Sequence, residues 1–158
     1  KIAQIKQISE NIFEYSLISG DQQIILEAPA TARDVFLDPL SETVGYLKRY
    51  GIALSLTSDW PEKRIRVYQP YIKRLLDNVT SNLIKYADPA VMVQAAVRQE
   101  GDQILLFFRN EVRPDASHED SSGIGLSNMR TMMEKMGGKL TVEQKDRMFQ
   151  VSLRFPVS

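Results

Sequence analysis

Hydrophobic residues recur at helical spacing in four stretches of the chain. Apolar positions three or four residues apart predict helices over residues 1–18, 38–50, 70–87 and 125–136. Asp38 and Pro39 are residue types of an N-cap and a first helical turn, and Gly51 would end this second helix. The third helix is expected to begin near Pro70 and to end before Asp88.

Apolar residues that alternate with polar or small ones predict strands between these helices. The expected strands cover residues 24–26, 52–56, 65–67, 91–98, 103–109, 139–144 and 148–155. Gly101 and Asp102 form a turn of the kind that joins hairpins. This order predicts an α+β fold, a two-layer α/β sandwich with three main helices on a mixed, mostly antiparallel sheet. A doubly wound parallel fold fits it less well.

Composition narrows the classes of function. The chain has 158 residues, 43% of them hydrophobic, which suits one globular domain. Twenty basic and twenty acidic residues cancel, so overall charge does not attract nucleic acid, and we expect no nucleic-acid partner. The chain has no cysteine and one histidine, His118, which excludes disulfides and the usual zinc clusters. The apolar runs are far shorter than a membrane span, and a cytoplasmic location fits.

The helix predicted over residues 70–87 has an unusual polar face. On a helical wheel Arg74, Asn78, Asn82 and Lys85 form one stripe opposite the apolar residues. Asparagine is a poor helix former, so two of them on this face cost stability. One interpretation is a merely solvated face. The other is that the two amide oxygens hold a magnesium ion with its phosphates, and that Lys85 supplies positive charge.

A glycine-containing segment, SSGIGL over residues 121–126, opens the fourth helix. Gly123 and Gly125 allow the backbone to approach a phosphate, and the first amides of a helix point at such an anion. A Gly-x-Gly before a helix is also common in ordinary loops. The motif alone therefore does not decide between these two interpretations.

Taken together, the two segments resemble motifs of sensor histidine kinases. Residues 74–87, RLLDNVTSNLIKYA, are similar to the N box of that family, and residues 123–129, GIGLSNM, are similar to its second glycine box. The GGKL of residues 137–140 and the RFP of residues 154–156 also match. The resemblance covers nearly the whole chain from residue 20 onward. It implies the Bergerat nucleotide-binding fold, ATP and Mg²⁺ as cofactors, and the activity of a protein histidine kinase.

The resemblance also implies a role for individual residues. Asn78 and Asn82 would bind magnesium and phosphate, Lys85 would contact phosphate, and Tyr86 would pack against adenine. Three further residues would line the phosphates and anchor a lid formed by residues 113–122. These are Gly123, Gly125 and Leu126.

The first glycine box departs from the family pattern. The family has Asp-x-Gly-x-Gly after a strand, whereas residues 109–114 read RNEVRP. Asn110 matches the aspartate, and its side-chain oxygen can still accept a hydrogen bond from the adenine amine, without the charge that strengthens such a bond. Both glycines are missing. Some sensor kinase subfamilies resemble this chain in having asparagine here, so we expect a working site.

The N-terminal residues resemble the end of a dimerisation and phosphoacceptor hairpin. Ile2, Ile5, Ile8 and Ile12 lie at helical spacing, so residues 1–19 would end the second hairpin helix and residues 20–158 would form the ATP-binding domain. Packing of this stripe against the domain itself is the alternative. The chain begins with Lys1 rather than Met, which suggests a fragment of a longer protein.

The resemblance implies partners for that longer protein. The γ-phosphoryl group would pass to a histidine on the protein's own dimerisation hairpin, in a homodimer, and then to an aspartate of a response regulator. The parent would be a membrane-anchored sensor. This fragment would bind ATP without phosphorylating itself, since His118 lies in the polar loop and is a poor candidate for the phosphoacceptor.

Two alternatives stay open at this point. One is a degenerate nucleotide-binding or interaction module, a pseudokinase, suggested by the missing glycines. The other is a serine kinase of the anti-sigma type with the same fold. Gyrase and mismatch-repair ATPases fit less well, because they carry a catalytic glutamate in the N box. The acidic residue of this chain is Asp77, which is rotated about 60 degrees from the edge of the stripe at Arg74 by the helical spacing.

Overall fold

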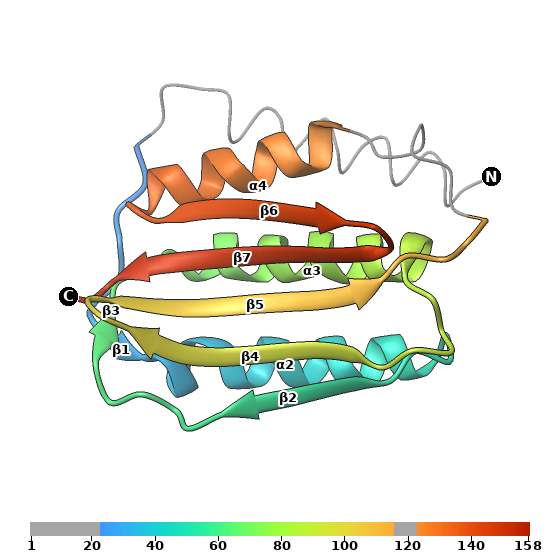
Figure 1. Cartoon of the computed structure of the whole chain (residues 1–158). Helices are drawn as coiled ribbons and strands as arrows, with labels where there is room; N and C mark the ends of the chain where they lie inside the picture. Colours follow the sequence, from blue (N-terminus) through green and yellow to red (C-terminus); the bar gives the residue numbers. More distant parts are fainter. Residues whose placement is uncertain (1–22, 116–122) are drawn as a thin grey trace.

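The computed structural model describes residues 23–115 and 123–158. Within these two ranges three helices cover one face of a five-stranded sheet, and a short two-stranded sheet lies beside it (Figure 1). The helices are α2 (Ala32–Lys48), α3 (Gln69–Tyr86) and α4 (Gly123–Lys135). The strands are β1 (Ala30–Thr31), β2 (Leu54–Ser58), β3 (Arg64–Ile65), β4 (Val93–Glu100), β5 (Gln103–Glu111), β6 (Lys139–Lys145) and β7 (Met148–Pro156). The predicted α+β sandwich is confirmed.

The main sheet is mixed. Its strand order is β2-β4-β5-β7-β6, with β2 parallel to β4 and every other neighbouring pair antiparallel. Side chains alternate between the two faces of a strand. In β5, Leu106 and Phe108 point into the core beneath the helices, so Asn110 points to the helix side and Arg109 and Glu111 to the outer side.

Helix α2 begins earlier than its sequence pattern suggests, so the predicted start at Asp38 and Pro39 is wrong. The helix begins at Ala32, where the side chain of Thr31 accepts a hydrogen bond from the backbone nitrogen of Asp34 at 3.3 Å. This is an N-cap that satisfies one of the unpaired amides of the first turn. The N-cap at Thr31 and the apolar residues after it place the start of the helix before Pro39, although proline is typical of a first helical turn.

Pro39 therefore lies inside α2. Because proline has no backbone N–H, the carbonyl of Val35 loses its helical donor. The side-chain nitrogen of Gln69, at the start of α3, donates to this carbonyl at 3.3 Å. The proline is thus tolerated because a neighbouring helix replaces the missing hydrogen bond.

The strand predicted over residues 24–26 is also wrong. Glu27 N donates to Val67 O at 2.8 Å, but the carbonyls of Leu26 and Glu27 accept hydrogen bonds from the Arg66 guanidinium at 2.8 and 2.9 Å. A side chain thus occupies the acceptors that a strand ladder would need. The helix predicted over residues 1–18 lies outside the described residues.

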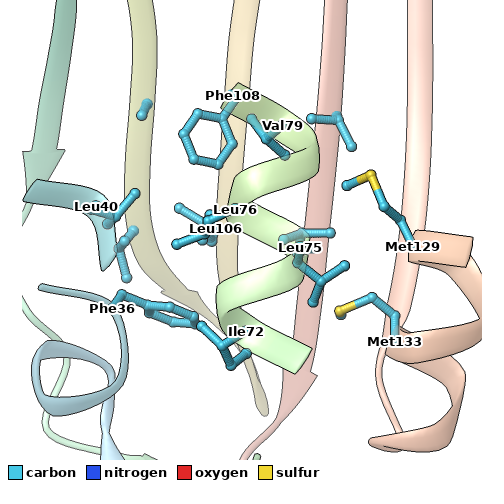
Figure 2. Close-up of a cluster of buried hydrophobic side chains, with 14 of the residues drawn as sticks. Phe36, Leu40, Ile72, Leu75, Leu76, Val79, Leu106, Phe108, Met129 and Met133 are labelled. Carbon is cyan, nitrogen blue, oxygen red and sulfur yellow. The ribbon is translucent and has the colours of Figure 1, made fainter. Parts of the chain in front are cut away.

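Helix α3 occupies the centre of the helical layer, and its predicted extent is confirmed within one residue at each end. Ile72, Leu75, Leu76 and Val79 point toward the sheet and the flanking helices (Figure 2). On the α2 side the hydroxyls of Thr80 and Thr43 are hydrogen-bonded at 3.1 Å. This packing fixes the rotation of α3 and so decides which of its residues face outward.

Helix α4 contributes buried methionines to the core beside α3. Met129, Met132, Met133 and Met136 are all buried, which confirms the expectation that they are core residues. Figure 2 shows Met129 and Met133 on the side of α4 that faces α3. The backbone nitrogen of Tyr68 donates to the sulfur of Met136 at 3.4 Å, so the start of α3 meets the end of α4. The two helices are therefore antiparallel, and the N-terminus of α4 lies toward the C-terminal half of α3 (Figure 1).

Candidate nucleotide-binding site

The polar stripe of α3 lies at the boundary between core and surface. Asn78 and Asn82 are half-buried, and Lys85 is exposed. The side-chain nitrogen of Asn78 is buried and has no hydrogen-bond acceptor among the described residues. A buried donor without an acceptor costs about 1–3 kcal/mol. A ligand that brought an acceptor oxygen to this point would remove that cost.

The end of α3 is joined to the end of β5. Arg113 N donates to Tyr86 O at 2.8 Å, and Asp88 N donates to Glu111 O at 2.8 Å. Ala87 and Val112 form an isolated antiparallel bridge between these contacts. These backbone contacts bring Tyr86 and the last residues of β5 to the same end of the molecule.

Asn110 is the buried polar residue at this end of β5, with 6% of its surface exposed. Its side-chain nitrogen donates to the carbonyl of Glu111 at 3.2 Å. This bond turns the amide nitrogen toward the chain's own backbone, so the amide oxygen is the atom that can accept a hydrogen bond from a ligand amine.

The start of α4 supplies the third part of the site. Gly123 is the first residue of the helix and Gly125 follows within its first turn. Leu126 is half-buried and packs against the core, and Asn128 is 8% exposed. The first backbone amides of a helix carry partial positive charge and attract anions. This end of α4 can therefore receive a phosphate near the C-terminal half of α3.

Two arginines hold this end of the molecule together, and neither contact was predicted from the sequence. The Arg113 guanidinium donates to the carbonyl of Lys85. Arg147, in the turn between β6 and β7, pairs with Asp88 at 3.0 Å and donates to the carbonyl of Val112 at 3.2 Å. Their partners are distant in sequence, so no local pattern indicated these contacts.

Asp77, the acidic residue beside the stripe, pairs with a lysine one turn earlier on α3. Its carboxylate lies 3.7 Å from the ammonium group of Lys73, and both side chains are about two-thirds exposed, at 65% and 67%. Exposed pairs one helical turn apart contribute little to stability. Asp77 is thus a surface residue of α3.

Three further properties bear on the possible chemistry. Residues 23–115 and 123–158 contain no group of three or more His, Asp or Glu side chains that could hold a metal ion. None of the helices that the structure describes is long and apolar enough to cross a membrane. His118 and residues 116–122 of the predicted lid lie outside the described residues.

Comparisons with known proteins bear on the family of the chain. Residues 68–158 match the family model described as histidine kinase-, DNA gyrase B- and HSP90-like ATPase. The sensor histidine kinase YrkQ of Bacillus subtilis (strain 168) is 28% identical over 155 residues, which cover 98% of this chain and 36% of YrkQ. The chain thus spans about a third of this relative.

Two solved structures share the fold at low sequence identity. Full-length ShkA in complex with AMPPNP matches with a TM-score of 0.77 and 15% identity, over 98% of this chain and 36% of ShkA. Histidine kinase ThkA in complex with the response regulator TrrA matches with a TM-score of 0.73 and 16% identity, over 99% of this chain and 48% of that chain. At this identity the likeness bears on the fold. The family match over more than half of the chain shows that the chain belongs to the histidine kinase-, DNA gyrase B- and HSP90-like ATPases, and within them it corresponds to the ATP-binding domain of a sensor histidine kinase.

Proposed function

We propose that this chain binds Mg-ATP along the polar stripe of α3 and, in the full-length protein, donates the γ-phosphoryl group to a histidine of a dimerisation hairpin. One observation carries the proposal. Two half-buried asparagines stand one turn apart on the outward face of α3, and the amide nitrogen of Asn78 is buried without an acceptor among the described residues. An acceptor oxygen of a phosphate would satisfy that donor.

The residues present fit a magnesium-bound phosphate. Asn78 and Asn82 would offer amide oxygens to the ion, and phosphate oxygens and water would complete its shell, as magnesium prefers. Bound there, the ion would neutralise charge on the phosphates. Lys85 would add a second positive charge, and the backbone amides at Gly123 and Gly125 would bind phosphate oxygens.

The adenine would lie at the joined ends of α3 and β5. Tyr86 would pack against the base, and the Asn110 oxygen would accept a hydrogen bond from the exocyclic amine. Leu126, in the first turn of α4, would line the phosphates beside the base. AMPPNP, an analogue of ATP, is bound to ShkA, which has the same fold, and this supports a nucleotide as the ligand.

The rest of the kinase reaction belongs to parts of the parent protein outside this domain. The proposed site positions phosphates and neutralises their charge, which is most of what phosphoryl transfer requires of a protein. We propose residues 1–19 as the end of the dimerisation hairpin of a homodimeric, membrane-anchored sensor, and 20–158 as its cytoplasmic ATP-binding domain. The phosphoryl group would pass on to a response regulator, as the complex of ThkA with TrrA suggests.

A degenerate nucleotide-binding module is the second candidate. It is favoured by Val112 and Pro114, which occupy the positions of the two glycines in the first glycine box. Such a module would keep the fold and would interact with partners without transferring phosphate.

Calorimetric titration tests the proposed function. ATP is titrated into the chain with and without Mg²⁺, and into the variants Asn82→Ala and Asp77→Asn. We expect ATP binding that depends on Mg²⁺ and that Asn82→Ala weakens at least tenfold. Alanine removes the side-chain oxygen that would coordinate the magnesium ion bound to the phosphates. Asp77→Asn is the matched control on the same helix and should bind as wild type does. Absence of binding at millimolar ATP would favour the degenerate module.

A transfer assay then separates the kinase from the module. The chain is mixed with Mg-ATP labelled at the γ-phosphorus and with a separately produced dimerisation hairpin of the parent protein. The kinase predicts acid-labile, base-stable label on the hairpin, as expected of phosphohistidine. Binding of ATP without label on the hairpin would support the module instead.

A further inference from the structure

The turn between β6 and β7 contacts the loops that follow α3 and β5, at the end of the sheet where the proposed adenine contacts lie. We infer that Arg147, in this turn, is a positioning residue that holds the ends of α3 and β5 at the separation that adenine binding requires. The inference rests on the proposed function, because it assumes that Tyr86 and Asn110 contact the base. Arg147 itself lies outside the proposed nucleotide contacts.

Arg147 bonds to two segments at once. Its terminal nitrogen lies 3.0 Å from a carboxylate oxygen of Asp88, and its Nε donates to the carbonyl of Val112 at 3.2 Å. The backbone nitrogen of Val112 in turn donates to the carbonyl of Arg147 at 2.7 Å. Asp88 is held on its other side, where its second carboxylate oxygen accepts from Ala90 N at 2.9 Å. The guanidinium thus joins the loop after α3 to the loop after β5, beside the backbone contacts and the bond from the Arg113 guanidinium to the Lys85 carbonyl.

The anchored residues stand next to the proposed adenine contacts. Asp88 follows Tyr86 by two residues, and Val112 follows Asn110 by two residues. Displacement of either loop would change the gap between the tyrosine ring and the Asn110 oxygen. Small displacements of positioned groups have large effects on ligand recognition. The phosphate groups would bind further along α3, at Asn78 and Asn82, which the arginine does not anchor.

A matched pair at the opposite end of the sheet provides a control. Arg98 lies 2.9 Å from Glu100, and these side chains are 55% and 39% exposed. The side chain of Arg147 is 51% exposed, but Asp88 is only 19% exposed. Both pairs join an arginine to a carboxylate, yet Arg98 and Glu100 belong to the same strand, β4.

Binding to two ligands tests the inference. The dissociation constants of Mg-ATP and of Mg-tripolyphosphate are measured for wild type, Arg147→Met, Asp88→Asn, the double variant and the control Arg98→Met. We expect Arg147→Met to raise the Kd of ATP about five- to tenfold, the size of one ordinary hydrogen bond, and to leave the Kd of tripolyphosphate unchanged. The double variant should bind ATP no worse than the weaker single variant, because both residues act through one contact.

Rescue by lysine sharpens the test. Lysine at position 147 can pair with Asp88, but it has no Nε group to donate to the carbonyl of Val112. Arg147→Lys should therefore bind ATP with a Kd between those of the wild type and Arg147→Met. Arg98→Met should bind both ligands as wild type does.

The outcomes separate the inference from the proposed function. Unchanged ATP affinity in Arg147→Met, while the wild type binds ATP, would overturn the positioning role and leave the function intact. Equal weakening for ATP and tripolyphosphate would also overturn it, because a lost positive charge or a loosened fold acts on both ligands. A wild type that bound neither ligand would overturn both.

Discussion

The two ends of the main sheet carry the same kind of ion pair with different structural consequences. At one end the carboxylate of Glu100 accepts hydrogen bonds from Arg98, in the same strand β4, and from Arg154, in β7. Both contacts therefore lie within the main sheet. At the other end Asp88 accepts from Arg147, and this pair ties the loops after α3, β5 and β6. The first arrangement braces a sheet that its backbone ladder already holds. The second sets the position of the segments that carry the proposed adenine contacts. What an ion pair does thus depends on the elements that it connects.

The largest expected effect on folding is at the Glu100 end. A Cβ atom on Gly138 would overlap the carbonyl oxygen of Arg154 and lie 2.9 Å from the terminal carbon of Met133. We expect Gly138→Ala to lower the free energy of unfolding by about 2–3 kcal/mol, since overpacking against backbone forces the strands to shift. Urea denaturation measures this loss.

Gly45→Ala is the control for this substitution. Gly45 lies inside α2, and an added Cβ there meets nothing within 4 Å. Alanine should therefore stabilise the chain by about 0.5–1 kcal/mol through its higher helix propensity. Ordinary surface substitutions change the free energy of unfolding by less than about 0.5 kcal/mol. If Gly138→Ala lowered it by no more than that, the close packing at this end would be contradicted.

The second prediction compares the two carboxylates directly. Asp88→Ala removes hydrogen bonds from Arg147 and from Ala90 N to a mostly buried carboxylate, and should cost about 1–2 kcal/mol. Glu100→Ala removes a more exposed acceptor and should cost less than about 1 kcal/mol. Denaturant melts of the two variants decide the order. A larger loss for Glu100→Ala would reverse our comparison of the two ends.

The smallest effect is the pH dependence at Glu100. Hydrogen bonding from Arg154, aided by Arg98, lowers the pKa of Glu100 below its ordinary value of 4.5. A carboxyl whose pKa is lower in the folded state stabilises that state above the unfolded pKa, and this contribution is lost as pH falls through the folded pKa. The difference in stability between wild type and Glu100→Gln should therefore be constant at neutral pH and shrink below about pH 4.5. A difference that grew on acidification would contradict the assignment.

The sequence predicted the elements whose signals are local. The apolar stripe of α3 and the Gly101-Asp102 turn of the β4–β5 hairpin are confirmed, and the helical period alone put Asn78, Asn82 and Lys85 on one face. The roles of those residues stay predictions. Such agreement arises where local pattern and tertiary packing favour the same structure.

The errors and omissions have a common physical origin. The start of α2 was misplaced because Pro39 looked like a first-turn residue, whereas a side chain from α3 satisfies the carbonyl that this proline leaves unpaired. The pairing of Arg147 with Asp88 joins residues 59 positions apart. Neither interaction can be predicted from the spacing of neighbouring residues, because each depends on how elements that are distant in sequence pack together.

Amide hydrogen exchange with and without Mg-ATP locates the nucleotide site, since it reports on both ends of the sheet in one experiment. We expect Mg-ATP to slow exchange in residues 78–88 and 110–113 and to leave exchange in residues 98–104 and 152–156 unchanged. Protection confined to the Glu100 end, or no change at either end under saturating Mg-ATP, would contradict the placement of the nucleotide site.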